Sequence, residues 1–335
     1  MTLKISELVR DGYERVVSFS DDSGFQAYIA IHSTILGPAL GGCRIKSYAS
    51  TDDALTDVLL LSKGMTYKSS IAGLNFGGGK CVVMAEKATR EIMLKVGEAV
   101  EYFNGLYVTA EDVGTTLADI QTAAEVTDYT VHLDGSSMTA RGVLACMKTA
   151  VKFHGGWGEE LNGLPIWVQG LGKVGMDLAE RIAAHIPDHL NLMVSDLRPE
   201  AVTQAEAMGA RELTEGDKRF VAIYAPCAMG QVINADNVNK VNYSIICGSA
   251  NNQLLHDDYA EVLRQRDVLY CPEFLVNAGG IINASYEFER DFDQQKCEEH
   301  TDYLSEVLLK VLTMAKDDNT TPLKIAMQLA EAGLE

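Results

Sequence analysis

The sequence predicts an α/β fold of two domains, and three observations lead to this expectation. A chain of 335 residues is longer than one hydrophobic core usually grows. The first part mixes β-type runs with helical patterns, whereas from about residue 164 strand-like and helix-like segments alternate regularly. Such alternation is typical of parallel βαβ units with helices on both faces of a sheet. We expect a first domain over 1–135 and a second over 136–285, separated by a cleft, with helices of 286–335 packing back toward the first.

The first domain contains both periodicities. Residues 25–33, "FQAYIAIHS", form a β-type run, and the apolar residues of 51–65 recur at the helical i, i+3, i+4 spacing. Thr51 or Asp52 is available as the N-cap of that helix. A second helical pattern, 90–105, ends at a glycine, which commonly terminates a helix.

The second domain alternates between the two patterns. Its expected strands are 165–170, 190–196, 221–226, 243–250 and 268–274, and its expected helices are 173–186 and 199–210. A further helical pattern, 300–318, follows this domain.

The composition excludes several classes of partner. A net charge of -19 gives no basic footprint for nucleic acid or an anionic membrane, and no apolar run is long enough to cross a bilayer. Seven scattered cysteines without a CxxC pair are typical of reduced thiols, so we expect a cytoplasmic protein. His185 and His189 are separated by Pro187 and cannot share one helical face, so we expect no metal site.

The stretch "GLGKVG" predicts a dinucleotide-binding turn of the Rossmann type. It has the GxGxxG spacing, directly after a strand and at the start of a helix, and its residues are Gly170, Leu171, Gly172, Lys173, Val174 and Gly175. The next strand ends at Asp196, where a carboxylate can accept hydrogen bonds from an adenosine ribose. A carboxylate there repels a 2′-phosphate and favours NAD, although Arg198 leaves NADP possible. A turn that serves packing alone is the alternative interpretation.

The stretch "KGMTYKSSIAGLNFGGGK", residues 63–80, places lysines around three glycines in an acidic chain. It is not a phosphate-binding P-loop, because Leu74 replaces the first glycine and Cys81 the Ser or Thr that binds a metal. We interpret the glycines as a flexible backbone that lets a ligand approach Lys80. If Lys68 lies beside Lys80, one can be neutral near pH 7 and act as a base while the other holds a carboxylate. Two solvated surface lysines are the alternative.

A third stretch, "YVTAEDVGTT", sets Glu111 and Asp112 among apolar and small residues. A carboxylate that follows a strand in this way is typical of catalytic groups in α/β proteins. Helix capping or a surface position is the alternative, and we expect only one of the two acids to face a substrate.

These motifs together resemble a known family. The segments "GPALGGCR", "GMTYKSSIAGLNFGGGK", "TAEDVGTT", "GLGKVG", "YAPCAMG", "SANNQL" and "NAGGIIN" occur in the order, and nearly at the spacing, of the glutamate/leucine/phenylalanine/valine dehydrogenase family, and are most similar to its leucine dehydrogenase members. The resemblance covers nearly the whole chain. It implies NAD-dependent, reversible oxidative deamination of an L-amino acid to a 2-oxo acid and ammonia, with the first domain binding the substrate.

The resemblance also implies roles for individual residues. Lys68 matches the lysine that binds the substrate α-carboxylate, Lys80 the catalytic lysine and Asp112 the catalytic aspartate. Further matches on the cofactor side are Thr139, Leu197, Cys227, Ala228, Asn251 and Asn277, and on the substrate side Gly41 and Asn252.

The implied side-chain pocket is apolar. It is formed by Leu40, Ala110, Ile281 and Ala284. Leu40 stands where glutamate dehydrogenases carry a lysine, and an unpaired second carboxylate in such a pocket is costly, so we expect a hydrophobic substrate such as leucine, valine or isoleucine. Ala284 replaces a bulkier valine, so a phenylalanine- or tryptophan-type substrate is the alternative.

Two departures from the family pattern leave other readings open. The segment 131–138 is shorter than in leucine dehydrogenase, which leaves the choice of substrate and the strength of turnover open. The chain also ends at Glu335, short of the C-terminal arm of octameric relatives, so a homo-oligomer of either two or eight subunits is expected. A non-catalytic nucleotide-binding protein is the third hypothesis. It is the least favoured, because Lys68, Lys80 and Asp112 are all present.

Overall fold

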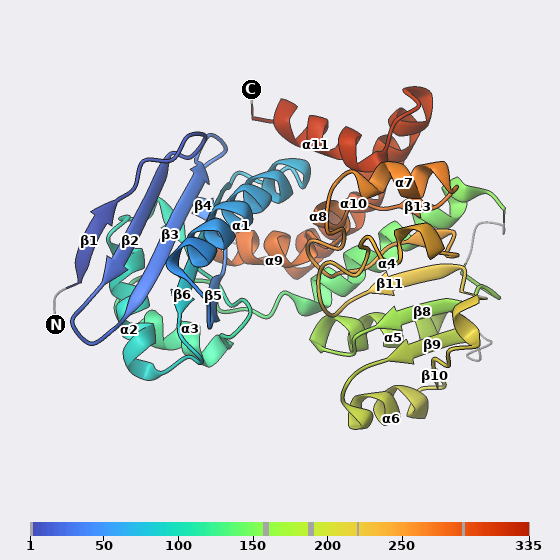
Figure 1. Ribbon diagram of the computed structural model, residues 1–335, viewed down its shortest axis with the longest axis horizontal. Coiled ribbons are helices and arrows are strands. Elements are labelled where there is room, and N and C mark those ends of the chain that lie inside the picture. The colour runs from blue at the N-terminus through green and yellow to red at the C-terminus, as the bar shows by residue number, and fades with distance from the viewer. Residues whose placement is uncertain (1–2, 157–160, 187–190, 220, 290–291, 335) are drawn as a thin grey trace. The chain divides into compact units, whose positions relative to one another are not determined.

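The chain contains two compact units, described here from a computed structural model (Figure 1). The residues described are 3–156, 161–186, 191–219, 221–289 and 292–334. The first unit comprises Met1–Asp134, Ile281–Asp293 and Ala330–Glu335, and the second comprises Gly135–Gly280 and Gln294–Leu329. Both contain helices and a β-sheet, so the predicted α/β class is confirmed.

The first unit is built on a seven-stranded mixed sheet (Figure 1). Its strands are β1 (Lys4–Glu7), β2 (Arg15–Ser20), β3 (Gln26–Ser33), β4 (Ala39–Leu40), β5 (Cys43–Lys46), β6 (Gly77–Met84) and β7 (Tyr107–Val108). They lie in the order β1-β2-β3-β6-β4-β7, and β5 also pairs with β6. Pairing is antiparallel from β1 through β3 to β6 and parallel around β4, β5 and β7.

Three helices pack against this sheet, and the alternation of strand side chains separates two cores. The helices are α1 (Thr51–Ile71), α2 (Arg90–Glu101) and α3 (Leu117–Ala123). Val83 of β6 belongs to the core formed with α2 and α3, whereas Val82 packs with α1. Successive strand residues point to opposite faces, so Lys80 lies on the same face as Val82, the face of α1.

Helix α1 differs from its prediction at both ends. The side chain of Ser50 accepts a hydrogen bond from the Asp53 N–H at 3.1 Å, so Ser50 is the N-cap and the choice of Thr51 or Asp52 was wrong. The helix also continues beyond the predicted 51–65, to Ile71.

The second unit contains a six-stranded parallel sheet (Figure 1). Its strands are β8 (Ile166–Gln169), β9 (Leu192–Ser195), β10 (Arg211–Glu212), β11 (Ile223–Pro226), β12 (Ile245–Ile246) and β13 (Leu269–Tyr270). The order β10-β9-β8-β11-β12-β13 is that of a dinucleotide-binding Rossmann fold, in which ligands bind where the strand order reverses. Here that point lies between β8 and β11.

The remaining helices connect and cover these strands. They are α4 (Ser136–His154), α5 (Lys173–His185), α6 (Pro199–Ala207), α7 (Tyr259–Gln265), α8 (Glu273–Val276), α9 (Gly279–Phe288), α10 (Gln294–Asp317) and α11 (Pro322–Ala332), with 3-10 turns η2 (Asp217–Arg219) and η3 (Val238–Lys240). The division between the two units falls within α9 and within α11.

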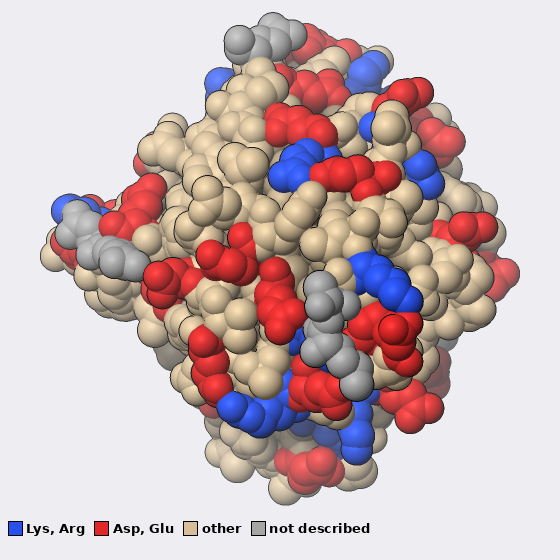
Figure 2. All heavy atoms as spheres, turned by 90° about the vertical axis from the view of Figure 1, so that its left-hand side faces the viewer, with Lys and Arg blue, Asp and Glu red and all other residues tan. Residues whose placement is uncertain are grey.

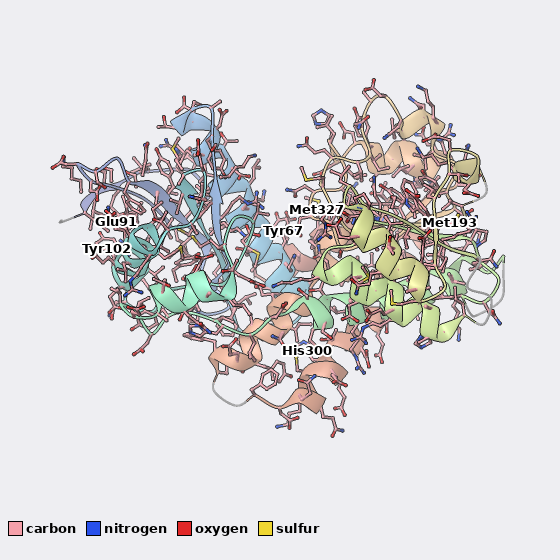
Figure 3. All side chains as sticks on the ribbon, turned by 90° about the horizontal axis from the view of Figure 1, so that it is seen from below. Tyr67, Glu91, Tyr102, Met193, His300 and Met327 are labelled. Carbon is pink, nitrogen blue, oxygen red and sulfur yellow. The ribbon has the colours of Figure 1, made fainter. Side chains whose placement is uncertain are left out.

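The C-terminal helices differ from the expectation that 286–335 packs back toward the first domain. Helix α10 belongs to the second unit and packs along α4, where Arg141 binds Glu298 and Asp302, each at 2.7 Å. Of residues 286–335, the part up to Asp293 and the end of the chain from Ala330 group with the first unit. At that end the hydroxyl of Tyr67, labelled in Figure 3, donates to Glu331 at 2.6 Å.

Candidate active site

The first unit brings Lys80 and Asp112 together as an ion pair. Lys80 Nζ lies 2.9 Å from Asp112 Oδ2, and the two side chains are only 6% and 17% exposed. Lys80 is held on the buried strand β6, and Asp112 lies shortly after β7. Glu111 precedes it but takes no part in this pair, so only one of the two acids considered meets the lysine.

The local turn explains how Asp112 reaches its position. The Thr115 N–H donates to the Asp112 carbonyl at 3.0 Å, and Gly114 adopts a φ of +82° that suits glycine. The Asp112 N–H donates to the Thr115 hydroxyl oxygen at 2.9 Å, and that hydroxyl donates to the Cys43 carbonyl at 3.0 Å. A Cβ on Gly42 would lie 2.9 Å from Asp112 Cβ, so this glycine leaves room for the aspartate.

Arg44, for which the sequence motifs predicted no role, is a third member of the cluster. Its Nε donates to Asp112 Oδ2 at 3.0 Å, and its Nη1 donates to Asp57 Oδ2 of α1 at 3.1 Å. The Tyr48 hydroxyl donates to the same Asp57 oxygen at 2.6 Å. The sequence signal was the final arginine of "GPALGGCR", a cation within a motif of an acidic chain.

The electrostatics of this cluster favour an ionised aspartate. Burial acts to raise the pKa of Asp112, but the positive charges of Lys80 and Arg44 outweigh it and lower this pKa to about 2. Asp112 is therefore a carboxylate throughout the neutral range.

The glycines before Lys80 are not the flexible loop that we expected. Gly77, Gly78 and Gly79 are buried residues of β6. A Cβ on Gly78 would lie 2.1 Å from the Thr66 nitrogen of α1, and one on Gly79 would lie 2.7 Å from the Tyr107 ring. The run is therefore needed for close packing of α1 and β7 around the strand, and it fixes Lys80 on a rigid element.

The residues matched to the substrate pocket are also in the first unit. Leu40 is buried in β4 and pairs with Gly78 of β6, two residues before Lys80. The Gly41 carbonyl accepts a hydrogen bond from the Tyr107 hydroxyl at 2.6 Å. Further members are Ala110, half-buried before Asp112, Lys68, half-buried near the end of α1, and Ile281 and Ala284, buried on α9.

The second unit contains the predicted dinucleotide turn, between β8 and α5. Gly170 has a φ of +93°, and a Cβ on it would lie 2.5 Å from Ala228 Cβ. A Cβ on Gly175 would lie 1.8 Å from the Gly170 carbonyl oxygen. These two glycines serve the fold. Leu171 is buried, Lys173 is exposed and Val174 is half-buried in the same turn.

Asp196 holds this turn from the end of β9. Its Oδ2 accepts the Leu171 N–H at 2.6 Å, and its Oδ1 accepts the N–H of Arg198 at 2.9 Å and its Nε at 3.1 Å. Burial acts to raise the pKa of Asp196, but these hydrogen bonds outweigh burial and lower this pKa. Leu197, between Asp196 and Arg198 in the sequence, is fully exposed.

The other predicted cofactor residues lie at the ends of neighbouring elements. The Cys227 N–H donates to the Gln169 carbonyl at 2.7 Å, which brings the end of β11 beside the glycine turn. Asn277 Nδ2 donates to Asn251 Oδ1 at 2.8 Å. Asn252, predicted on the substrate side, follows Asn251 in the second unit and has a φ of +51°. A Cβ on Gly280 would lie 2.8 Å from Thr139 Oγ1, which places Thr139 beside the "NAGG" turn.

Three features of the second unit suit it to bind a dinucleotide. A Cβ on Gly172 would have no heavy atom of the described residues within 4 Å, so packing alone does not require this glycine. Among the described side chains none caps the N-terminus of α5, whose N–H groups therefore suit a pyrophosphate. Asn277 Oδ1 is buried and has no hydrogen-bond partner among the described residues.

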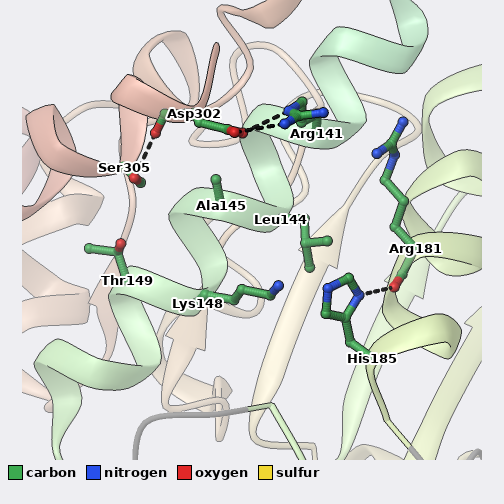
Figure 4. Close-up of a pocket in the computed structure, with 9 residues that line it drawn as sticks. All are labelled: Arg141, Leu144, Ala145, Lys148, Thr149, Arg181, His185, Asp302 and Ser305. Carbon is green, nitrogen blue, oxygen red and sulfur yellow. Dashed lines mark hydrogen bonds and ion pairs between the residues drawn. The ribbon is translucent and has the colours of Figure 1, made fainter. Parts of the chain in front are cut away.

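A separate pocket of about 510 Å³ lies among α4, α5 and α10 (Figure 4). Arg141 and Arg181 border it, but Arg141 is paired with Glu298 and Asp302, and Arg181 with Asp177. These arginine charges are balanced within the protein, and we assign no ligand to the pocket.

The described residues contain neither a cluster of metal-binding side chains nor a helix able to span a membrane. Across those parts of the chain, His, Cys, Asp and Glu side chains form no group of three or more suited to a metal ion; His189 lies outside the described residues. None of the described helices has the length and apolar character needed to span a bilayer.

Comparison with known proteins identifies relatives along most of the chain. Residues 13–129 match the family profile described as Glu/Leu/Phe/Val dehydrogenase, dimerisation domain. Residues 190–332 match the profile described as Glutamate/Leucine/Phenylalanine/Valine dehydrogenase. The resemblance inferred from the motifs is confirmed.

Individual relatives agree with these profiles. A leucine dehydrogenase of Bacillus cereus is 38% identical, over 99% of this chain and 93% of the relative. A valine dehydrogenase of Streptomyces virginiae is 37% identical, over 96% of this chain and 93% of the relative. Among solved structures, an L-tryptophan dehydrogenase from Nostoc punctiforme has a TM-score of 0.82 and 34% identity, with 96% of each chain covered.

Proposed function

Because the chain belongs to the Glu/Leu/Phe/Val dehydrogenase family, we propose that it catalyses the NAD-dependent, reversible oxidative deamination of a hydrophobic L-amino acid. The products are the 2-oxo acid and ammonia. The observation that carries the proposal is the buried pair of Lys80 and Asp112, two groups that can exchange protons with an amine and a water.

On the cofactor side, the proposal assigns the pyrophosphate to the turn around Gly172 and the N-terminus of α5, and the ribose hydroxyls to Asp196. Bound NAD supplies the ability to accept a hydride from the substrate Cα. The carboxylate of Asp196 supports NAD over NADP, because it repels a 2′-phosphate. Arg198 is paired to this carboxylate, so its charge does not stand apart as a phosphate site.

On the substrate side, Lys68 binds the α-carboxylate. The amine form of Lys80 takes a proton from the water that attacks the iminium carbon left after hydride loss, and becomes the ammonium. The ammonium form of Lys80 stabilises the oxygen that results, and Asp112 exchanges protons with the amine as the carbinolamine collapses. Lys80 and Asp112 lie in a buried cluster, where electrostatic interactions are stronger than in water.

Aliphatic substrates are our first choice, supported by the buried Leu40, which offers no counter-charge to a second carboxylate. An aromatic substrate is the second candidate. It is favoured by the small side chain of Ala284 and by the similarity to a tryptophan dehydrogenase.

We also propose a cytoplasmic homo-oligomer. The seven cysteines are free thiols, which suits a reducing compartment, and the profile matched by 13–129 is that of a dimerisation domain. Light scattering of the purified protein distinguishes a dimer from an octamer.

The test is to follow NADH formation with leucine, valine, phenylalanine, tryptophan and glutamate, with NAD and NADP in parallel. We expect turnover of at least one apolar amino acid with NAD, no preference for glutamate, and loss of turnover in Lys80→Ala. Lys63→Ala is the control, because this exposed lysine of α1 has no proposed role. Full activity in Lys80→Ala, or a preference for glutamate, contradicts the proposal.

A further inference from the structure

We propose that Arg44 is a positioning residue that holds the catalytic carboxylate of Asp112 in one orientation and in its ionised form. This inference rests on the proposed function and adds a residue to it. Arg44 is not assigned to contact the substrate; it acts through Asp112.

Both cations meet the same carboxylate oxygen of Asp112. Oδ2 lies 2.9 Å from Lys80 Nζ and 3.0 Å from Arg44 Nε, and the Val113 N–H also donates a hydrogen bond to this carboxylate. Two cations from adjacent strands, β6 and β5, therefore fix the rotamer of the aspartate.

Arg44 is itself held from the other side. Its Nη1 binds Asp57 Oδ2 of α1 at 3.1 Å, and the Tyr48 hydroxyl donates to that same oxygen. The side chains of Arg44 and Asp57 are 16% and 25% exposed, so salt screens this chain of charges less than it screens a surface pair. The charge of Arg44 is shared between two carboxylates, one at the reacting centre and one behind it.

The charged and titratable groups around Asp112 come from every element packed on it. They are Lys80 of β6, Arg44 of β5, the buried thiols Cys43 and Cys81, Tyr107 of β7, Tyr48, and Asp57 of α1. Among them the two cations favour the ionised form, and burial opposes it. If Arg44 is removed, Lys80 is the only one of these two cations that remains beside Asp112.

The sign of the pH effect follows from this arrangement. The form of Asp112 that accepts a proton is the carboxylate, and its low pKa keeps it available in wild type down to strongly acidic pH. In Arg44→Gln the pKa of Asp112 rises, so activity is lost at a higher pH as the solution is acidified. In Asp57→Asn, Arg44 loses its competing partner, and the acid limb does not move upward.

The experiment measures kcat/KM against pH for wild type, Arg44→Gln, Arg44→Lys and Asp57→Asn. We expect Arg44→Gln to lower kcat/KM at neutral pH by about tenfold to a hundredfold, because a misplaced catalytic group loses rate on that scale, and to shift the acid limb upward. Arg44→Lys, which keeps the charge, should lie closer to wild type in its acid limb. Arg90→Gln is the matched control, because it removes an exposed arginine that binds Glu125 with two hydrogen bonds on the same unit.

Equal effects of Arg44→Gln and Asp57→Asn, with no change in profile shape, would mean a merely structural role and overturn the proposal. If wild type oxidises no amino acid, the proposed function fails first. The role of Arg44 is then decided by ¹³C NMR titration of the Asp112 carboxyl, assigned with Asp112→Asn, where an unchanged pKa in Arg44→Gln refutes it.

Discussion

At the scale of single residues, the glycines of the dinucleotide turn separate fold from function. Gly172→Ala adds a methyl group that meets no described atom, so we expect an unchanged melting temperature. The same methyl group occupies the space assigned to the pyrophosphate. Losing one hydrogen bond to a charged group weakens binding by about 1.5–3 kcal/mol, or roughly tenfold or more in Kd for NAD.

Gly175→Ala is the contrasting variant. Its Cβ would lie 1.8 Å from the Gly170 carbonyl oxygen, so we expect a clear fall in melting temperature that does not depend on NAD binding. Thermal melts and NAD titrations of both variants check the pair. Equal destabilisation by the two substitutions, or normal NAD affinity in Gly172→Ala, would contradict the assignment.

Residue identities could be predicted where a motif fixes their chemistry. The positions of Gly170 and Asp196, directly after β8 and β9, followed from spacing alone, whereas the hydrogen bond from the Leu171 N–H to the Asp196 carboxylate was not predicted. Arg44 did not follow, because its importance depends on Asp112, 68 positions later in the chain, and on Asp57 from a helix between them. A single sequence does not reveal which carboxylates surround an arginine.

At the scale of elements, the contact between α1 and β6 decides where Lys80 lies. Gly78→Ala would place a Cβ 2.1 Å from the Thr66 nitrogen, which is backbone and cannot move alone. We expect a loss of about 1–3 kcal/mol or more in unfolding free energy, as for other overpacked cores. Turnover should fall as well, because α1 and β6 carry Asp57 and Lys80.

Gly64→Ala on the same helix is the control for the Gly78 variant. Gly64 is exposed, and no described heavy atom lies within 4 Å of its added Cβ. Alanine in a helix interior should therefore stabilise the protein by about 0.5–1 kcal/mol. Urea denaturation measures both variants, and a Gly78→Ala protein as stable as wild type would restore the flexible-loop interpretation.

The error about the glycine run has a physical origin. Consecutive glycines are equally expected in a mobile loop and in a strand approached closely by other backbone, and local sequence does not distinguish them. The neighbours that require Gly77 and Gly78 are Ser33, from a distant strand, and Thr66, which is close in sequence but lies on α1, whose packing on β6 is not visible in the local sequence. Hydrophobic periodicity, by contrast, is local, so α2 and α5 began at their predicted residues, Arg90 and Lys173.

At the scale of the whole molecule, local pattern predicts the elements better than their partners. The alternation after residue 164 was sufficient for the parallel sheet, whose strand order is that of a Rossmann fold. The placement of α10 was not predictable in the same way. Its Leu304 contacts α4 where Gly142 has no side chain, with only 3.1 Å from an added Cβ to Leu304 Cδ1. Such a fit between two helices cannot be predicted from the sequence of either helix alone.

The net charge of the whole chain makes its stability depend on salt. At -19, acidic side chains repel one another, and Figure 2 shows them spread over the face drawn, with basic side chains among them. Salt screens this repulsion but also weakens exposed ion pairs such as Arg90–Glu125, which are each worth only about 0–1 kcal/mol. Repulsion is the larger effect, so added NaCl should stabilise the protein at pH 7.

We expect the melting temperature to rise by about 1–2 °C between low salt and roughly 0.5 M NaCl, because about 1 kcal/mol shifts it by about 2–4 °C in a protein of 150–250 residues and by less in a longer chain. The same salt step at pH 5, close to the sequence pI of about 4.7, is the internal control, because little net charge remains to be screened. A rise of equal size at both pH values would point to strengthened hydrophobic burial rather than charge screening. A fall at pH 7 would mean that the ion pairs outweigh the repulsion.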